Sequence, residues 1–384
     1  TPKKEEVVAD PIRHGGSKEK SRRAYEEMMA QCLAEANRVL KPGGILAVVY
    51  AHKTTMGWAT LVDALRRAGF MITEAWPVDT EMKSRLRSMD SAALASSIFL
   101  VGRKRRGAAV PLATNSKPEE CSGLVGSYED EVQPELQQIV RERVQTLWEM
   151  GITGADLVIA CVGAGLRAFT KYERVEYANG EEVPAEKFLA EVEGVVLDTM
   201  LEKLFGHSPG TVSAIDPPSR FYVLWRFIYK SAEIDAGEAI VFAYSQLVEL
   251  DGPHGLATGR YALLEKKKSK YRARDFTERG DNPSLGLPGE DGQPAPLIDV
   301  LHRVLWLMEN SPGKLGEFLD EARPNRERLR VLAQALAGAA LSGKSEEDAQ
   351  KLLTTTAPEQ AALKKLLANW RTLAGELPLF DRRE

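Results

Sequence analysis

The chain has 384 residues, of which 43% are hydrophobic and 28% charged, so it is long enough for two or three domains with packed cores. The hydrophobic content argues against a wholly disordered chain, and no stretch approaches the ~18 apolar residues of a membrane span. The net charge is −4. Three scattered cysteines and no basic-then-apolar leader favour a cytoplasmic protein without disulfides and without a metal site.

The charge is unevenly distributed along the chain. Residues 1–107 hold 19 Lys and Arg against 12 Asp and Glu, a balance of +7, and the remainder carries −11. A basic first part is compatible with a polyanionic partner, although an excess of this size is weak support for one. The chain begins with Thr1, and we interpret it as a piece of a longer protein.

The first elements are a loop, a helix and a strand. Residues 1–16 have no hydrophobic period, and Ser17 is a suitable N-cap for a helix over about 18–40. The sequence "LKPGG" ends that helix, because proline cannot continue it and glycine allows a reversal. The apolar run Ile45–Tyr50 does not alternate, which predicts a strand buried on both faces.

A layered α/β pattern continues to about residue 107. We expect a helix at about 56–68, a strand at Phe70–Pro77 and another at Ser97–Arg103. Helices alternating with strands predict a sheet that is covered on both sides. Residues 108–127 are rich in Pro, Ala, Ser and Gly and are typical of a linker.

From residue 128 to 384 the pattern is mostly helical. Residues 259–275 predict a two-stranded hairpin, which with a helix at 235–250 could form a winged-helix-like unit over 235–275. The predicted helices are 130–150, 154–170, 184–205, 218–231, 235–250, 296–309, 313–320, 325–341, 345–354 and 358–374.

Several blocks of sequence resemble one family. A helix ending in Leu-Lys-Pro-Gly-Gly, an apolar strand and a helix ending in Ala-Gly-Phe are similar to the second half of the sheet in S-adenosylmethionine-dependent methyltransferases, whose last two strands form an antiparallel hairpin. The blocks "PKKEEVVADPIRHGG", "RVLKPGG", "VVYAHKTT", "AWPVDTEM" and "SAALASSIFLVGRKR" resemble, more narrowly, the large bacterial and archaeal DNA methylases described as adenine-specific and zinc-ribbon-containing. So do "GADLVIACVGAGLRAFTKYERV", "RFYVLWRFIYKSAEI" and "PLIDVLHRVLWLM", and the resemblance covers most of the chain.

The resemblance implies an α/β fold and a reaction. Residues 1–107 would be the C-terminal half of a doubly wound, Rossmann-like methyltransferase sheet, followed by a mostly helical region. The reaction would transfer a methyl group from S-adenosylmethionine to a flipped base in DNA, adenine N6 rather than cytosine N4. The family's glycine-rich cofactor loop and Asp/Asn-Pro-Pro-aromatic motif are missing here and would lie upstream of Thr1. We therefore expect no catalytic residue in this chain and a cofactor bound mainly by upstream residues.

Two segments mimic the missing motifs. In Asp216-Pro217-Pro218-Ser219 the last residue cannot stack on a base, so we interpret the segment as a proline-started helix capped by Asp216. Gly163-Ala164-Gly165 follows an apolar run, but no turn-rich loop comes after it. We interpret it as part of a buried helix.

The candidate substrate-binding residues lie in three segments near the sheet. In an open α/β sheet, ligands bind beyond the carboxyl ends of the strands, which is where Ile45–Tyr50 leads. Each segment also has a structural alternative. The residues after the strand could cap the next helix or lie in an exposed loop, the first loop could be an ordinary solvated connection, and the segment between the last two strands could be a solvated helix face. The residues are His52, Lys53 and Thr54 after the strand, Arg13 and His14 in the first loop, and Arg85 and Arg87 between the last two strands.

The predicted hairpin carries the candidate contacts to a DNA backbone. They are interleaved with tyrosines, although such runs are usually exposed turns. The residues are Lys266, Lys267, Lys268, Lys270 and Arg272. We expect Phe221, Tyr222, Trp225, Phe227 and Tyr229 in the core, and His302 as a hydrogen-bonded histidine rather than a metal ligand.

Two further functions remain open from the sequence. A truncated methylase could serve as a non-catalytic module that binds DNA or a protein. Alternatively, the methylation could act on RNA or a small molecule.

Overall fold

The structure, a computed structural model of the chain, describes residues 6–50, 56–79, 96–105, 124–152, 154–206, 212–259, 261–289, 292–338 and 355–373. These residues fold as two compact units. The first lies within Thr1–Lys83, Leu94–Ile152 and Asp156–Val196, and the second within Thr153–Ala155 and Leu197–Glu384. The sheet and the helices that follow it therefore share a unit, whereas we expected the helical region to be separate from residue 128.

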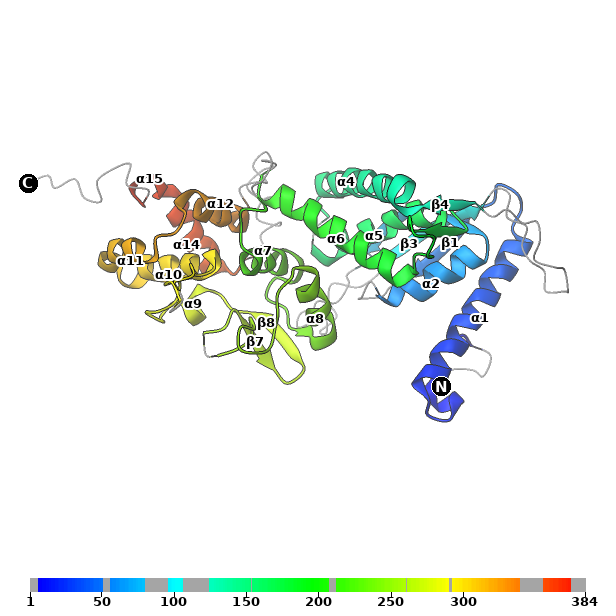
Figure 1. The fold of residues 1–384 in the computed structure, drawn as a ribbon, viewed down its shortest axis with the longest axis horizontal. Helices are drawn as coiled ribbons and strands as arrows, with labels where there is room; N and C mark the ends of the chain where they lie inside the picture. The colour runs from blue at the N-terminus through cyan, green and yellow to red at the C-terminus, as the bar shows by residue number, and fades with distance from the viewer. Residues whose placement is uncertain are drawn as a thin grey trace, which may run out of the picture. The chain divides into compact units, whose positions relative to one another are not determined.

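The first unit contains a three-stranded sheet, a two-stranded parallel ladder and five main helices (Figure 1). Its elements are η1 (Pro11–His14), α1 (Lys18–Val39), β1 (Leu46–Tyr50), α2 (Met56–Arg67), β2 (Phe70–Asp79), β3 (Ser96–Lys104), β4 (Val125–Ser127), η2 (Tyr128–Val132), α4 (Gln133–Glu149), α5 (Gly154–Thr170), β5 (Arg174–Glu176) and most of α6 (Ala185–Leu204).

The turn before β1 forms as the sequence predicts. The Ser17 hydroxyl accepts a hydrogen bond from the N–H of Lys20 at 3.3 Å and so begins α1. After α1 ends at Val39, Gly43 adopts a φ of 75°, a left-handed conformation that glycine reaches without steric cost. This reversal delivers the chain into β1.

The order of the three-stranded sheet is β1-β3-β2, and β3 is antiparallel to both neighbours. β1 and β2 therefore run in the same direction, and α2 connects them. Leu100 of β3 lies opposite Val48 on one side and Ala75 on the other. The register of β2 shifts between Ile72 and Glu74, where Thr73 is the extra residue of a bulge.

Helices α2 and α5 pack on the same face of this sheet. Trp58 of α2 packs edge-on against Tyr50, with 5.2 Å between ring centroids. Gly163 of α5 lies against Ala75 and Leu100, so close that an added Cβ would come within 2.8 Å of the Ala75 methyl group. Directly opposite residues in antiparallel strands point to the same face, so these contacts define one covered face.

The other face of the sheet is open, and we call it the bare sheet face. Val49 is 55% exposed and Trp76 41% exposed, so the prediction that β1 is buried on both faces is wrong. The physical reason is that, among the described residues, α2 and α5 pack on the first face, and only the Arg143 side chain of α4 reaches the second, over Trp76. The bare sheet face consists of Ala47 and Val49 of β1, Phe99 and Val101 of β3, and Trp76 and Val78 of β2.

The two edges of the sheet also differ. Two main-chain groups of β2 bond to side chains of helices: the N–H of Ile72 donates to Thr170 Oγ1 at 2.9 Å, and Arg143 donates to the carbonyl of Ala75. At the outer edge of β1, no described residue bonds to the outward main-chain groups of residues 46–49. The sheet is thus closed at β2 and open at β1.

The second unit is mostly helical, as the sequence predicts. An aromatic cluster at its centre includes Phe221, Trp225 and Phe242, which are all at most 2% exposed. Its elements are α7 (Pro217–Tyr229), β6 (Ile234–Asp235), α8 (Ala236–Ser245), β7 (Leu264–Lys267), β8 (Lys270–Ala273), α9 (Phe276–Arg279), α10 (Leu297–Asn310), η3 (Pro312–Lys314), α11 (Leu315–Ala322), α12 (Arg326–Ala337), α14 (Ala357–Ala368) and α15 (Trp370–Leu373).

The predicted hairpin is present as β7 and β8, with β6 added at its other side in the order β6-β8-β7. The helix predicted over 235–250 is shorter and ends at Ser245. Residues 246–259 form turns without a helix, so this unit lacks the second helix that a winged-helix motif presents to DNA. Within the described residues, no helix is long and apolar enough to cross a bilayer.

Candidate functional site

The predicted substrate-binding residues are only partly described. His52, Lys53 and Thr54, at the carboxyl end of β1, lie outside the described residues, as do Arg85 and Arg87. The structure therefore does not bring these side chains together with any other predicted group.

Arg13 and His14 form the end of η1. The Asp10 carboxylate begins this turn by accepting from the N–H of Ile12 at 3.0 Å. The Arg13 guanidinium donates to the Glu6 carbonyl at 3.0 Å and lies 3.8 Å from Asp10. The Arg13 side chain therefore helps to hold the loop in shape.

The open edge of β1 adjoins the bare sheet face, so an unpaired strand edge and exposed apolar side chains lie side by side. An unpaired strand edge offers main-chain donors and acceptors to another strand. On the adjoining face Val49, Trp76 and Val78 are 55%, 41% and 42% exposed. This arrangement can receive a neighbouring strand together with a helix packed on the face.

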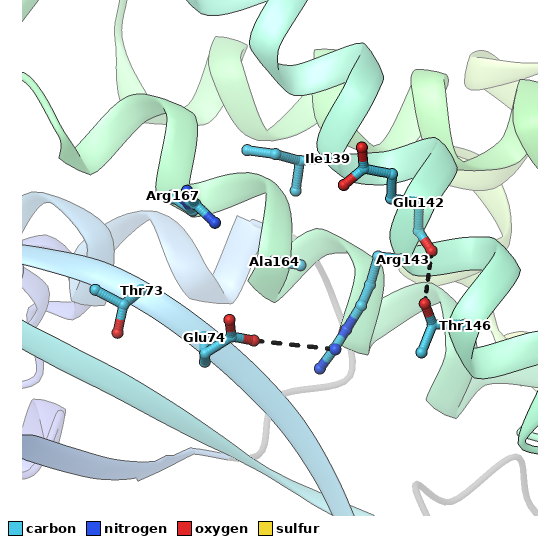
Figure 2. Close-up of a pocket in the computed structure, with 8 residues that line it drawn as sticks. All are labelled: Thr73, Glu74, Ile139, Glu142, Arg143, Thr146, Ala164 and Arg167. Carbon is cyan, nitrogen blue, oxygen red and sulfur yellow. Dashed lines mark hydrogen bonds and ion pairs between the residues drawn. The ribbon is translucent and has the colours of Figure 1, made fainter.

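A small pocket lies between β2, α4 and α5, with a volume of about 160 Å³ (Figure 2). The Arg143 guanidinium lies 4.3 Å from the centroid of the Trp76 ring and 3.9 Å from the Glu74 carboxylate. These two contacts fix its position in the pocket lining. Arg167, also in the wall, has no ion pair with a described residue. The lining residues are Thr73, Glu74, Ile139, Glu142, Arg143, Thr146, Ala164 and Arg167.

The charges in this pocket balance, because two arginines face two glutamates. Such a wall suits a small molecule that carries both charges better than a polyanion. Sequence reasoning missed this pocket. Its residues come from three elements, and no local pattern marks them as neighbours.

The basic residues of the hairpin are mostly engaged in ion pairs. Lys266 Nζ lies 2.8 Å from an Asp251 oxygen, and Arg272 makes two hydrogen bonds to Glu278 at 2.6 and 3.0 Å. The hydrogen bond between Lys266 and Asp251 is the main reason why the pKa of Lys266 is raised and the pKa of Asp251 is lowered.

Weaker pairs engage two more cations of the hairpin. Lys267 lies 3.7 Å from Glu265, and Lys270 lies 3.9 Å from Glu233. Lys268 is at the turn, with a φ of 54°, and has no ion pair with a described residue. Of these five residues only Lys268 has no ion pair with a described residue, so they do not present a row of five unpaired cations to a phosphate.

The two motif lookalikes have structural roles, as we interpreted them. The Asp216 carboxylate accepts from the N–H of Ser219 at 3.0 Å and caps α7, and its second oxygen accepts from the N–H of Leu297 at 3.0 Å at the start of α10. Gly163 and Gly165 lie inside α5, where the sheet and Val192 leave no space for side chains.

A buried charged network joins the helices of the second unit. Glu359, with no exposed surface, lies 3.2 Å from Arg226 Nη2 and 2.8 Å from the Tyr222 hydroxyl. His302 Nε2 lies 3.3 Å from the same carboxylate, and its Nδ1 lies 3.3 Å from Arg279 Nη1. Because arginine can only donate, Nδ1 accepts and the imidazole proton is on Nε2.

Burial determines the charge state of this network. It lowers the pKa of His302 and raises that of Tyr222 well above its usual value, so both are neutral near pH 7. The neutral ring makes His302 a hydrogen-bonded histidine, as expected. The residues of the network are packed in the core, so we assign it to holding the helices together.

No group of described side chains has the composition of a metal site. The Cys161 thiol is buried, which raises its pKa to about 12 and makes it a poor nucleophile. Comparisons of the chain with protein-family models, with curated proteins and with solved structures find no match.

Proposed function

We propose that this chain is the C-terminal part of a DNA amino-methyltransferase, which transfers a methyl group from S-adenosylmethionine to adenine N6, with cytosine N4 as the second choice. The chain would contribute the last strands of a Rossmann-like sheet and a helical region. The groups that bind the cofactor and act on the base would come from polypeptide that precedes this chain.

The observation that carries this proposal is that the sheet has bonding partners at its β2 edge but none at its β1 edge among the described residues. Side chains of Thr170 and Arg143 bond to main-chain groups at the edge of β2, whereas the outer edge of β1 has no partner among the described residues, and the bare sheet face is covered there only by Arg143, over Trp76. An antiparallel sheet can leave one face in water, but that face is then normally polar, whereas Val49, Trp76 and Val78 on this face are apolar and exposed. The missing half of a doubly wound fold would supply both the neighbouring strand and the helices for that face.

The strand order gives further support. The family's last two strands pair in an antiparallel hairpin, and β2 and β3 are antiparallel neighbours. In this arrangement the carboxyl end of β1 leads to His52, Lys53 and Thr54. We propose that these residues, together with Arg13 and His14 of η1, line the DNA side of the cleft in the complete protein.

The glycine pair of α5 does not form a cofactor loop. A nucleotide loop needs glycines in a turn with space for phosphate or ribose. Gly163 and Gly165 are instead helical and in close contact with neighbours. We therefore derive no step of the reaction from groups in this chain.

The test is a transfer assay on the intact polypeptide that includes the upstream sequence. It would be incubated with unmethylated DNA and S-adenosylmethionine labelled on the methyl group, and the DNA nucleosides would be analysed by mass spectrometry. We expect label in N6-methyladenine. Absence of incorporation into any DNA would refute the proposal, and label in RNA or a small molecule alone would redirect it.

A second candidate is a non-catalytic binding module, and one observation favours it: α8 presents an exposed apolar surface. Because most hairpin cations are paired, this surface suits a protein better than DNA. A gel-shift titration of the 384-residue chain at several salt concentrations distinguishes a DNA-binding module from a protein-binding one. Salt-sensitive binding without cofactor would favour a DNA-binding module.

A further inference from the structure

The outer side of α8 is an unusual surface of the second unit. Ile240 and Val241 are 53% and 42% exposed, and Tyr244 and Leu247 are 83% and 82% exposed. Gly237 lies one turn before Ile240 on the same side of the helix. We call these five residues the α8 face. It contains no charged side chain.

The fold itself does not need this face. The inner side of α8 supplies Ala239, Phe242 and Ala243, which are at most 2% exposed, to the aromatic core. Contiguous exposed apolar patches of a few hundred Å² mark interaction sites in soluble proteins.

The end of α8 holds Leu247 outward at a conformational cost. Leu247 has a φ of 57°, a position that glycine usually occupies at a helix end. Its N–H bonds to the Tyr244 carbonyl at 3.1 Å, and the N–H of Val248 bonds to the Ala243 carbonyl at 3.1 Å. A leucine in this conformation costs roughly 1–2 kcal/mol. The Leu247 side chain at this position enlarges the exposed apolar surface of the α8 face and does not pack in the core.

The α8 face is complementary to itself. Gly237 and Tyr244 lie two turns apart, and Ile240 and Val241 lie midway between them. If two copies pack antiparallel about a twofold axis at that midpoint, Tyr244 of each copy lies over Gly237 of the other. The space is available, since a Cβ added to Gly237 would meet no atom within 4 Å. A twofold interface requires this kind of reciprocal match.

The flanks of the helix carry complementary charges. The N–H of Ala236 bonds to the Ser269 carbonyl at 2.8 Å, which places the hairpin turn and Lys268 beside the start of α8. Glu249 follows the end of α8 and is exposed. Lys268 and Glu249 have no ion pair with any residue that the structure describes. In the antiparallel arrangement Lys268 of each copy approaches Glu249 of the other.

We propose that the α8 face binds a second copy of this chain and forms a twofold dimer. This inference does not depend on the proposed methyltransferase function. A standard interface buries about 800 Å² on each partner, more than these side chains expose. The α8 face would therefore be the centre of a weak dimer, with the hairpin turn at its rim.

The first test is sedimentation equilibrium of the 384-residue chain over a range of concentrations. We expect a monomer–dimer equilibrium that Gly237→Phe weakens at least about tenfold, because the new ring occupies the space for Tyr244. The matched control is Gly316→Phe in α11, where an added Cβ also meets no atom within 4 Å. It should leave the dissociation constant unchanged. A chain that stays monomeric up to about 1 mM would refute the proposal.

A charge-exchange cycle tests the orientation of the two copies. Lys268→Glu and Glu249→Lys should each raise the dissociation constant, and the double variant should restore it toward the wild-type value. All of these positions are exposed, so folding should be unaffected, which circular dichroism would check. A dimer that none of these substitutions changes would form elsewhere and would overturn the assignment to α8.

Discussion

Glu359 has no exposed surface, yet its carboxylate contacts Arg226, Tyr222 and His302 from two other helices. Nearby, Thr356 donates to Asp275 at 2.8 Å, which ties the start of α14 to the start of α9. Although burial pushes the pKa of Asp275 upward, hydrogen bonds from Thr277 and Thr356 bring it below its usual value. At the residue scale, the packing of α14 thus depends on charges that satisfy one another away from water.

Removing one charge of this network should be costly. Glu359→Gln leaves the Arg226 guanidinium buried without a compensating charge, and we expect the free energy of unfolding to fall by about 3–5 kcal/mol. Glu317→Gln, on an exposed position of α11, is the control and should change it by less than about 0.5 kcal/mol. Urea unfolding followed by circular dichroism measures both. Equal midpoints for the two variants would show that the network contributes little.

The neutral His302 predicts a pH dependence. Burial lowers the pKa of His302 from 6.5, and the positive charge of Arg279 lowers it further. The negative charges of Glu359 and Asp299 raise the pKa but do not outweigh burial. Between the lowered value and 6.5, the unfolded chain binds a proton that the folded chain does not. The free energy of unfolding therefore falls as pH falls through that window, by at most about 1.4 kcal/mol per pH unit.

The variant His302→Gln isolates this contribution. The amide can accept from Arg279 and donate to Glu359, but it does not titrate. We expect the stability of the variant to vary less than that of the wild type between about pH 5 and 7. Urea unfolding at several pH values gives the comparison, and parallel curves for the two proteins would contradict the assignment to His302.

At the scale of elements, local patterns predicted most helices and strands. The predicted range of α5 matches the observed Gly154–Thr170, and β2, β3 and α10 lie within a few residues of their predicted ranges. These elements carry their own caps, turns and hydrophobic periods. The predicted helix at 345–354 and most of the linker at 108–127 lie outside the described residues.

The errors came from contacts between segments distant in sequence. The run Leu46–Tyr50 is apolar throughout, which predicts burial on both faces. In the structure α2 and α5 pack on the same face of the sheet, and the sequence of β1 does not indicate where α5 packs. The hairpin cations were recognised, but Asp251 and Glu233, which pair with Lys266 and Lys270, belong to other segments. Glu359 lies in an ordinary-looking helical sequence whose partners are more than 50 residues away.

The close approach of α5 to the sheet gives a prediction for one element. Gly163→Ala places a methyl group 2.8 Å from Ala75, and we expect it to lower the free energy of unfolding by about 1–3 kcal/mol. Gly194→Ala, within α6 where an added Cβ meets no atom within 4 Å, should be neutral or stabilising by up to ~1 kcal/mol. Thermal or urea unfolding distinguishes them, and equal effects would mean that the contact relaxes easily.

At the scale of the whole molecule, the first unit depends on helices beyond residue 107. A chain that ends at residue 107 loses α5, so the covered face with Ile98 and Leu100 would become exposed in addition to the bare sheet face. We expect this shorter chain to aggregate, and a chain ending at residue 206 to be more soluble. Light scattering and amide NMR spectra measure both, and a well-dispersed spectrum of the shorter chain would contradict the prediction.

The closed edge at β2 limits how this sheet can grow. Strands with two free edges can add further copies at each end and polymerise into fibres. Here Arg143 and Thr170 bond to the main-chain groups of Ala75 and Ile72 in β2, so another strand pairs more readily next to β1. Sheet extension by further copies of this chain should therefore favour a pair joined at β1 over a continuous fibre.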